Sequence, residues 1–533
     1  MSTTNVGVRS EALTTLLANK TAGSPALVVT IILAGLIVIC LRFFEERSQY
    51  PLANPPRWYQ IRFFKQLEFL TKGSEILSET RKRYGDKPYR LLTELGEVLV
   101  LPPGSAQLIR NEEQLDFSAA ITDDFYGHLP GFEPYALLQH DGQVVQTLVR
   151  KQLTKHLSIV SEPLSSEATF AARSIFGDDT DEEWKGICIR RAMLDLVARL
   201  SSRIFLGAEL CRNQEWLDIT KSYTVNSFAA ALRMKLVPQF LVVPYSWLSS
   251  DCKRVRQNLK DAEHVITPYI ERRRSLKAAA ESTGTPLPEF DDAIEWAEQE
   301  SKGVPYSPSI MQLLLSFAAI HTTSDLLTQT MLRLANKPES ITLLRKEIVD
   351  VIRSEGLGKS ALFHMKLLDS ALKEAQRIKP NSFLVMRRLA TQRIVLPGGI
   401  VIRMGERVAI DAVNMVSPEL YSHPEEYDIF RFLRMREDPK TANKAHLVST
   451  SPDHLTFGHG IHACPGRFFA ANETKIALCH LLLKYDWKLA DGASLAPVHT
   501  VGVMTTLDPA NKLLYRRRKE EVELDHLLVS SKE

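Results

Sequence analysis

The sequence has few cysteines, almost no excess of charge and no internal repeats. Its six cysteines include no C-x-x-C pair, which argues for a reducing compartment. A formal net charge of only +3 argues against a nucleic-acid partner, because phosphate binding needs a concentrated basic surface. No period of about 20 to 50 residues repeats, which excludes repeat architectures. The 533 residues, 44% of them hydrophobic, can therefore bury a large globular core.

A long run of uncharged, mostly apolar residues extends from Ala26 to Leu41. A membrane span usually needs about 20 residues, so Pro25 and the pair Phe43-Phe44 would complete it. A cleaved signal peptide is the competing interpretation, but the region before the run is barely basic and no small-residue cleavage site follows. Basic residues are more frequent after the run than before it, so the positive-inside rule places the body of the protein in the cytosol.

This run divides the chain into segments with different roles. The first, residues 1–24, is a short luminal tail in which Asn19 begins a glycosylation sequon. The sequon lies so close to the bilayer that low occupancy is expected. The remaining segments are an anchor at residues 25–44, a proline-rich extended linker at 45–60, one large domain at 61–518 and a charged tail at 519–533.

The large domain shows mainly helical periodicity, with a minority of strand patterns. The strongest helix signal runs from Ser309 to Asn336 and is apolar almost all round, so this helix is expected to be buried. Between Phe117 and Leu138, glycines and prolines interrupt any period, and a loop is expected. Other expected elements are helices at 64–84 and 143–158, strands at 91–101, 382–389 and 395–410, and a hairpin tip at 501–504.

A lone cysteine, Cys464, lies in a glycine-rich loop just before an apolar, helix-periodic run. Pro465 suits the first position of that helix, which would place the thiol at a helix N-terminus, where the dipole and free N–H groups lower a thiol pKa. Gly458, Gly460 and Gly466 allow the backbone to approach a flat, bulky cofactor. A thiolate metal ligand is therefore the predicted role of Cys464.

Three other interpretations of this loop are weaker. His459, His462 and Cys464 could bind zinc, but no second Cys or His pair follows at the spacing of structural zinc sites. The glycines also fit a dinucleotide-binding fingerprint, but the residues before them, 453–456, do not form an apolar strand. A structural buried cysteine would not require this arrangement of glycines and aromatic residues around it.

The spacing of Phe457, Gly460, Cys464 and Gly466 resembles the haem-binding loop of the cytochrome P450 superfamily, in which a cysteine thiolate is the axial ligand of haem b. The resemblance implies that His462 and Arg388, with its neighbour Arg387 as the alternative, contact the haem propionates. The family often has a Trp four residues before another propionate-binding Arg, and here Gln146 precedes Arg150, so only the Arg remains. The implied cofactor-binding residues are Arg150, Arg388, Phe457, Gly460, His462, Cys464 and Gly466, with Cys464 as the metal ligand.

The apolar helix carries Ala318 and Ala319 followed by His321 and Thr322, which resembles the distal, oxygen-binding helix of the family. There the small pair is followed by an acid and a Thr that relay protons. The resemblance implies catalytic roles for Thr322 and for His321, which replaces the acid. A neutral imidazole can shuttle protons near neutral pH. The alternative, from the residues alone, is that the threonine bonds back to a carbonyl four residues earlier.

Glu374 and Arg377 lie three residues apart on one helix face, where they can pair. The same spacing occurs at Glu271 and Arg274, so the spacing alone is weak evidence. The pair Glu374 and Arg377 is distinguished by its position in the chain, after the apolar helix and before Cys464. An arginine flanked by aromatic residues, Arg431, follows it. The resemblance implies that Glu374, Arg377 and Arg431 form a structural network on the proximal side of the haem.

The implied fold is mainly α (α+β): the cytochrome P450 helical prism with a small β-rich lobe, forming a haem-thiolate catalytic domain behind one N-terminal transmembrane helix. The implied reaction is a monooxygenation, in which one atom of O2 enters a small lipophilic substrate. NADPH-cytochrome P450 reductase would deliver the electrons, with cytochrome b5 as an optional donor. The protein would be a monomer in the endoplasmic reticulum membrane with a cytosolic catalytic domain. The implied pocket residues are Ala318, Phe383, Leu384, Val385, Val503 and Met504.

The residues around Thr322 and Cys464 look most like fungal family members that oxidise terpenoids, indole-diterpenes or other secondary metabolites. The apolar pocket residues would suit a hydroxylase of fatty acids or sterols as well. Two other functions stay open: an isomerase or peroxide-rearranging enzyme that needs no reductase, and a non-catalytic haem-binding membrane protein. The presence of Thr322 disfavours both.

Overall fold

The computed structural model describes residues 48–60, 62–139, 144–180, 183–301, 303–490, 492–495 and 498–524. The predicted luminal tail, its sequon and the membrane anchor lie outside these residues. By its contacts the chain divides into two units, Met1–Pro51 and Leu52–Glu533. Among the described residues, one helix, Pro308–Ala335, is long and apolar enough to cross a membrane, but most of it is buried inside the second unit.

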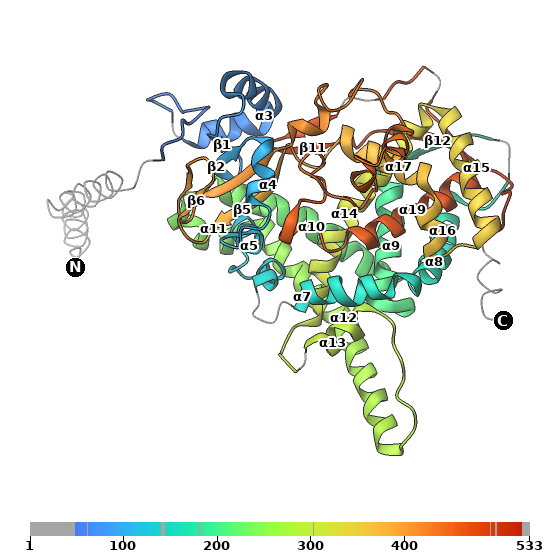
Figure 1. The fold of residues 1–533 in the computed structure, drawn as a ribbon. Helices are drawn as coiled ribbons and strands as arrows, with labels where there is room; N and C mark the ends of the chain where they lie inside the picture. The colour runs from blue at the N-terminus through green and yellow to red at the C-terminus, as the bar shows by residue number, and fades with distance from the viewer. Residues whose placement is uncertain are drawn as a thin grey trace, which may run out of the picture. The chain divides into compact units, whose positions relative to one another are not determined.

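The second unit is largely helical, and most of its long helices share one hydrophobic core (Figure 1). Its α-helices are α3 (Arg62–Tyr84), α4 (Ala106–Ile109), α5 (Phe117–Asp124), α6 (Glu133–Ala136), α7 (Val144–Thr147), α8 (Ser161–Phe176), α9 (Ile189–Leu210), α10 (Gln214–Lys235), α11 (Val242–Leu248), α12 (Ser250–Thr283), α13 (Ala293–Ser301), α14 (Pro308–Ala335), α15 (Pro338–Glu355), α16 (Lys359–His364), α17 (Lys366–Ile378), α18 (Arg431–Glu437) and α19 (Arg467–Lys484).

Helix α14 lies within the helical part and contacts α9, α10, α12, α17 and α19. Ser307 caps its N-terminus by accepting the N–H of Ile310 (3.5 Å). Pro308 occupies the first turn, where backbone N–H groups have no partner within the helix, so the missing N–H of proline costs no hydrogen bond. Because its sequence is apolar on nearly every face, most of its side chains are buried. The prediction of a buried helix at Ser309–Asn336 is confirmed.

The β-structure forms one five-stranded sheet and three smaller sheets among the described residues. The large sheet has the order β1-β2-β8-β5-β3, in which β2 and β8 run parallel and the other pairs are antiparallel. The strands are β1 (Tyr89–Thr93), β2 (Gly96–Leu101), β3 (Leu115–Asp116), β4 (Lys185–Cys188), β5 (Leu384–Ala390), β6 (Ile394–Leu396), β7 (Ile400–Ile402), β8 (Arg407–Asp411), β9 (Tyr485–Lys488), β10 (His499–Val501), β11 (Met504–Thr506) and β12 (Lys512–Arg517).

Strand β5 departs from regular geometry in its middle. Its register against β8 shifts between Val385 and Arg388, and Met386 there adopts a left-handed φ of 49°. A bulge of this kind re-aims the side chains around it. The neighbouring side chains of Arg387 and Arg388 accordingly reach different partners, Asp124 and the ring of Phe117.

The strands around β1, β2 and β5 share a separate hydrophobic cluster with α3, termed the β-lobe core. Leu384 and Val503, both predicted to line the substrate pocket, are 2% exposed within it. Burial of such a side chain contributes about 1.5–3 kcal/mol. The end of the predicted linker also joins this lobe, because the Asn54 amide exchanges two hydrogen bonds with the backbone of Leu92 (2.9 Å each).

Most predicted elements are confirmed, and one is wrong. The predicted helix at 143–158 is irregular: α7 continues into a π-helical segment, η3 (Leu148–Leu153), and a short 3-10 turn. The region Phe117–Leu138, predicted as a loop, contains α5 and α6 instead. Asp116 starts α5 by accepting the N–H groups of Ser118 (2.6 Å) and Ala119 (3.2 Å), and the glycines and prolines after α5 hid this short helix from a periodicity argument.

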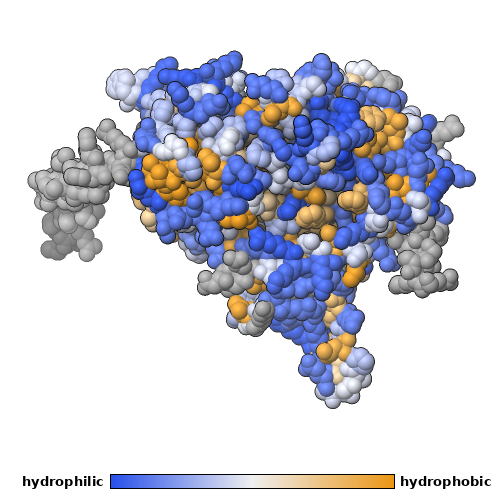
Figure 2. All heavy atoms as spheres, viewed as in Figure 1, coloured by the Kyte–Doolittle hydropathy of each residue, from blue (hydrophilic) through white to orange (hydrophobic). Residues whose placement is uncertain are grey.

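Exposed apolar side chains gather on the side of the second unit where α11 and β6 lie (Figure 2). A contiguous exposed apolar surface marks an interaction with a membrane or another molecule. The exposed residues of this surface include Phe240, Val243, Trp247, Leu248 and Val395.

Candidate functional site

The Cys464 loop docks through its backbone on the end of helix α4. The N–H of Ile461 donates to the carbonyl of Arg110 (3.0 Å). Gly460 has a φ of 81°, and a Cβ at this position would lie 2.0 Å from that carbonyl oxygen. Both the dihedral and the space therefore require glycine. The N–H of Cys464 donates to the carbonyl of Phe457 (2.8 Å), which closes the loop.

The helix that follows the loop begins at Arg467, with Gly466 as its N-cap. Pro465 therefore lies in the turn before the helix, and its prediction as the first helical residue is wrong. Burial raises the pKa of the Cys464 thiol above its ordinary value, whereas the backbone N–H groups of Gly466 and Arg467 and the Arg467 guanidinium act in the opposite direction. The predicted lowering of this pKa is also wrong in sign, because desolvation exceeds the effect of the helix end.

Two basic side chains beside the loop, the buried Arg388 and the half-buried His462, are incompletely hydrogen-bonded. Arg388 is 3% exposed, and its Nε has no partner. The Nε2 of His462 has none either. Both side chains flank Phe117, whose ring centroid lies 5.5 Å from the Arg388 guanidinium carbon and 6.5 Å from the His462 ring centroid. A buried guanidinium N–H without an acceptor is costly, so Arg388 suits an anionic group.

A second arginine reaches the same loop. Arg150 donates to the carbonyl of Ile461 (2.9 Å) from the π-helical segment η3, a kind of turn that is frequent at functional sites. Burial, then the Arg388 guanidinium and further the Arg150 guanidinium, lower the pKa of His462 to about 4, so its imidazole is neutral. Arg150, Arg388 and His462 thus form a basic rim beside Cys464, and its two guanidinium groups fit the two carboxylates of a haem.

The geometry does not support a zinc site in this loop. The Nδ1 of His459 pairs with the Thr450 hydroxyl (3.1 Å) and its Nε2 with the Gln107 amide oxygen (3.3 Å), so both ring nitrogens are engaged. Within the part of the chain that the structure describes, the group of side chains close enough to share a metal ion is elsewhere and fully exposed: His423, Glu425 and Glu426.

Helix α14 presents an exposed stripe at Ala318 and Thr322, one turn apart on an otherwise mostly buried helix. The Thr322 hydroxyl donates to the carbonyls of Ala318 (2.8 Å) and Ala319 (3.2 Å). This is the local bonding that a threonine inside a helix favours without any ligand. Because the side chain is exposed, the hydroxyl is able to exchange this bond for one to a bound molecule.

His321 is directed toward helix α10. Its Nε2 lies 3.3 Å from the carbonyl oxygen of Lys221. A carbonyl only accepts hydrogen bonds, so we assign the proton to Nε2 and the basic lone pair to Nδ1. Burial lowers the pKa of His321 below its ordinary value, which keeps the imidazole neutral at pH 7. His321 and Thr322, although adjacent in sequence, therefore point in different directions.

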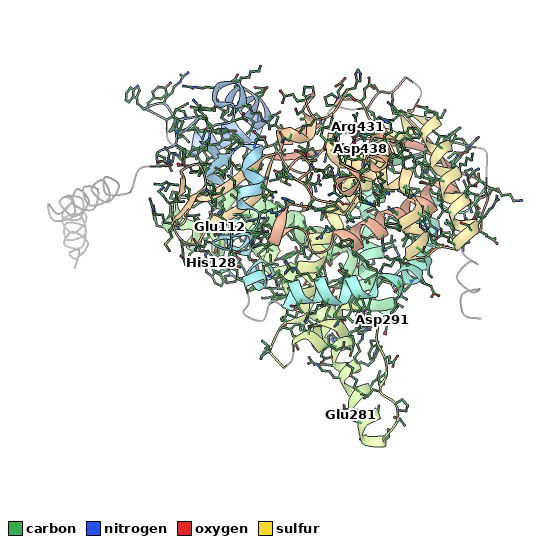
Figure 3. All side chains as sticks on the ribbon, in the orientation of Figure 1. Glu112, His128, Glu281, Asp291, Arg431 and Asp438 are labelled. Carbon is green, nitrogen blue, oxygen red and sulfur yellow. The ribbon has the colours of Figure 1, made fainter. Side chains whose placement is uncertain are left out.

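The structure brings Glu374, Arg377 and Arg431 together in a buried network. The Glu374 carboxylate accepts two hydrogen bonds from Arg377 (2.8 Å each) and one from Arg431 (2.9 Å). The side chains of Glu374 and Arg377 are 0% exposed and that of Arg431 8%. The two arginines also donate to four backbone carbonyls between residues 415 and 424, which attaches that segment to α17 near the labelled Arg431 (Figure 3).

The structure joins two segments that were predicted to line the substrate pocket. The N–H of Phe383 donates to the carbonyl of Val503 (3.0 Å), so the start of β5 contacts the β10–β11 tip. The side chains of Leu384 and Val503 pack into the β-lobe core. Phe383, Val385 and Met504 remain partly or fully exposed.

Sequence periodicity did not reveal an aromatic cluster beside Ala318. Phe317, its neighbour on α14, lies 5.5 Å from Phe125, 4.8 Å from Tyr135 and 5.7 Å from Phe228 between ring centroids. Such spacings are favourable for aromatic pairs. Phe125 and Tyr135 come from the region that was predicted as a loop, so the cluster could not be recognised before α5 and α6 were seen.

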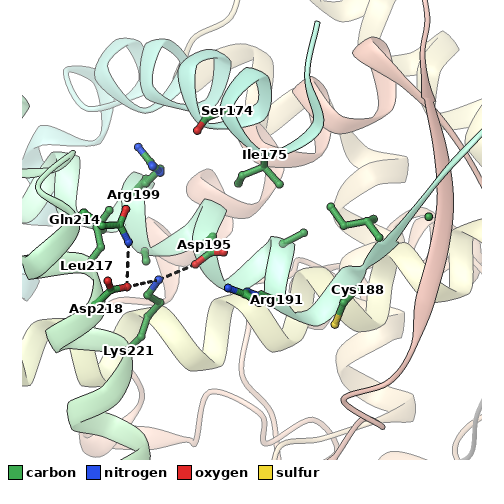
Figure 4. Close-up of a pocket in the computed structure, with 14 residues that line it drawn as sticks. Ser174, Ile175, Cys188, Arg191, Asp195, Arg199, Gln214, Leu217, Asp218 and Lys221 are labelled. Carbon is green, nitrogen blue, oxygen red and sulfur yellow. Dashed lines mark hydrogen bonds and ion pairs between the residues drawn. The ribbon is translucent and has the colours of Figure 1, made fainter. Parts of the chain in front are cut away.

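A cavity of about 550 Å³ lies between α8, β4, α9 and α10 (Figure 4). Lys221 sits between two carboxylates there, 2.7 Å from Asp195 and 3.1 Å from Asp218. None of the predicted site residues lines this cavity, so it is separate from the Cys464 loop.

Known proteins similar to this chain share its fold and most of its length. The family model described as Cytochrome P450 matches residues 52–514. The cytochrome P450 monooxygenase eqxH of Fusarium heterosporum is 41% identical over 92% of this chain and 94% of its own length. The cytochrome P450 monooxygenase hepE of Aspergillus oryzae is 42% identical over 93% of this chain and 90% of its own.

A solved structure, that of retinoic acid-bound cyanobacterial CYP120A1, has a TM-score of 0.63 at 17% identity, over 88% of this chain and 100% of that one. The predicted mainly helical fold with a small β-rich lobe is confirmed, and so is the predicted enzyme family.

Proposed function

Because the chain belongs to the cytochrome P450 family, we propose that it is a haem-thiolate monooxygenase that inserts one oxygen atom from O2 into a lipophilic substrate. Cys464 is the axial ligand of haem b. When bound, the haem supplies the dioxygen chemistry, and thiolate ligation favours cleavage of the O–O bond. NADPH provides the electrons through cytochrome P450 reductase, with cytochrome b5 as an optional second donor.

The basic rim is the observation that carries this proposal. The Nε of Arg388 and the Nε2 of His462 are buried without partners, and Arg150 adds a second guanidinium at the loop. Two propionates would accept hydrogen bonds from the two guanidinium groups, which bind carboxylates strongly. A loop that merely buried a structural cysteine would leave them unsatisfied. Gly460 allows the loop to dock closely on the end of α4.

We assign proton handling to α14. The exposed hydroxyl of Thr322 is the group that delivers protons toward the reaction, because its present bonds are local ones to Ala318 and Ala319. The adjacent His321 offers a basic Nδ1 while its Nε2–H stays bonded to Lys221. Since the two side chains point in different directions, a proton would pass between them through a water molecule.

The network of Glu374, Arg377 and Arg431 has a structural role in this proposal. It holds the segment between residues 415 and 424 against α17. Its three side chains are buried, so none of them is assigned a contact with substrate.

The proposed substrate is a terpenoid, an indole-diterpene or a related secondary metabolite. The aromatic cluster and Ala318 offer a partly exposed apolar surface of the kind that such a molecule needs. The proposed location is the endoplasmic reticulum membrane, with residues 25–44 as the anchor and a monomeric catalytic domain in the cytosol. The exposed Phe240, Trp247 and Leu248 support attachment to a lipid surface.

The test is the carbon monoxide difference spectrum of the reduced protein in microsomes. Wild type should show the long-wavelength band of a thiolate-ligated haem, and Cys464→Ala should lose it. Cys188→Ala, which changes a half-buried cysteine of β4, is the matched control and should keep it. No band in folded, haem-loaded wild type would refute thiolate ligation.

NADPH and reductase should then reduce the wild-type haem and support substrate oxidation. Turnover that is independent of NADPH would favour the isomerase or peroxide-rearranging alternative instead.

A further inference from the structure

A group of charged side chains, termed the polar cluster, lies among the elements that carry the predicted pocket residues. Glu94 comes from the β1–β2 turn, Asp124 ends α5, Arg387 lies in β5 and Arg407 begins β8. Glu94 and Asp124 are only 4% and 3% exposed. Carboxylates are rarely buried to this extent unless their oxygens are fully bonded, so the partners of these two groups decide what the polar cluster does.

The positive side chains of the polar cluster are held by ion pairs. Arg387 pairs with one oxygen of Asp124, and Arg407 pairs with Asp123 and donates to the carbonyl of Leu95 (3.1 Å). Burial lowers the pKa of Arg387 below its ordinary value, and the charge of the Glu94 carboxylate acts in the opposite direction. Four segments that are distant in sequence therefore meet at one place.

Glu94 also contacts the β10–β11 tip. Its Oε1 accepts the N–H of Val503 (3.2 Å). Gly502 has a φ of 60°, and a Cβ there would lie 2.3 Å from the Glu94 carboxyl carbon, so glycine is required for the carboxylate to come this close. The polar cluster is thus continuous with the tip that also contacts Phe383.

Three buried polar atoms of the polar cluster have no hydrogen-bond partner: Oε2 of Glu94, Oδ1 of Asp124 and Nε of Arg407. The last two form an ion pair at 3.5 Å, too long for a good hydrogen bond. Two acceptors and one donor therefore lack a good hydrogen bond. A hydroxyl or amide group is able to accept from the Nε and to donate to a carboxylate oxygen, and so meets both needs.

The neighbours of the polar cluster are apolar. Phe125 follows Asp124 directly and contacts Phe317, which precedes Ala318 on α14. On β5, Arg387 is two residues from the partly exposed Val385. The elements that carry the polar cluster therefore continue directly into apolar residues beside α14 and at the start of β5.

We propose that the polar cluster binds a hydroxyl or amide group of the substrate and so orients the apolar part of that substrate along α14. This inference rests on the proposed monooxygenase function and narrows its substrate class to apolar molecules that carry at least one neutral hydrogen-bond donor. A carboxylate suits the polar cluster less well, because it brings no donor hydrogen to Glu94 and Asp124. A hydrocarbon or an ether leaves their oxygens unsatisfied.

The test uses four diterpene probes with one shared ring system: abietadiene, abietadienol, the methyl ether of abietadienol and abietic acid. Dissociation constants are measured by equilibrium dialysis and, independently, by the change in the haem Soret band. Wild type should bind the alcohol about tenfold more tightly than the ether, which lacks the donor, and also more tightly than the acid or the hydrocarbon.

Two isosteric variants of the same hairpin separate this role from a general structural one. Glu94→Gln turns the unpartnered acceptor into a donor and should reduce the preference for the alcohol over the ether to within about twofold. Glu97→Gln, which changes a half-buried carboxylate paired with Arg90, is the matched control and should leave the preference unchanged. Asp124→Asn should weaken the preference in the same direction as Glu94→Gln.

Equal binding of the alcohol and the ether, tightest binding of the acid, or no measurable binding of the alcohol would overturn the inference and leave the polar cluster as a water site. An equal effect of Glu97→Gln would do the same. The dialysis does not depend on haem ligation, so a missing carbon monoxide band would refute the proposed function alone, whereas a normal band without probe discrimination would refute only this inference.

Discussion

Replacing Arg377 with methionine should destabilise the protein by about 3–5 kcal/mol. The substitution keeps most of the side-chain length but removes two hydrogen bonds to the Glu374 carboxylate and two to backbone carbonyls. A hydrogen bond to a charged group contributes about 1.5–3 kcal/mol, and the larger effect is the fully buried carboxylate that loses one of its two guanidinium partners. Arg431, at 2.9 Å, remains as the other partner.

Urea denaturation, followed by both far-UV circular dichroism and haem absorbance, measures this loss when the two transitions coincide. Glu374→Leu should lower the free energy of unfolding by a similar amount. The double variant should lose less free energy of unfolding than the sum of the two single variants, because the second substitution removes the charge that the first leaves unpaired.

The chain contains its own control for this experiment, the other copy of the same motif. Arg274 is 58% exposed and lies 3.6 Å from Glu298, so Arg274→Met should cost less than about 1 kcal/mol. Equal shifts of the unfolding midpoint for Arg377→Met and Arg274→Met, or strict additivity of Arg377→Met with Glu374→Leu, would show that burial of the network does not determine its contribution.

Gly460→Ala should prevent stable haem incorporation, because the new Cβ would lie 2.0 Å from the Arg110 carbonyl oxygen at a φ of 81°. Gly104→Ala, which meets no atom within 4 Å, should incorporate haem normally, and equal haem content would contradict the argument. Glu473 is buried with one hydrogen bond, from Ser201 (2.7 Å), and burial raises its pKa from 4.5 to about 8. The folded protein therefore keeps a proton that the unfolded chain releases, so stability should fall by up to about 4 kcal/mol as the pH rises through this range. Glu473→Gln should flatten the plot of unfolding free energy against pH in this range, and an unchanged slope would refute the raised pKa of Glu473.

Features that depend on neighbouring residues could be predicted from the sequence. The glycine spacing around Cys464 predicted unusual dihedrals and a close approach of the backbone to a cofactor. The structure confirms a positive φ at Gly460, but the close approach there is to the Arg110 carbonyl. Glu374 and Arg377 were expected to pair because residues three apart share a helix face. The apolar pattern of α14 predicted its burial for the same local reason.

Features that depend on desolvation could not be predicted in this way. The helix end beside Cys464 suggested that the pKa of the thiol is lowered, but burial of the thiol raises this pKa. Leu384 and Val503 looked like pocket residues, but they pack into the β-lobe core, because the pleat of β5 and the docking of the β10–β11 tip determine which side chains turn inward.

The sequence by itself indicated the fold family through the resemblance of its motifs, and it determined the glycine-rich loop at Cys464 and the buried helix that carries Thr322 through dihedral preference and helical period. Only the tertiary structure decided that Arg388 and His462 share the ring of Phe117, each with an unpartnered nitrogen, and that Glu94, Asp124 and Arg387 meet beside the β10–β11 tip. Those groups come from segments far apart in the chain. Whether a buried polar atom has a partner depends on which segments pack together, and no local pattern records that.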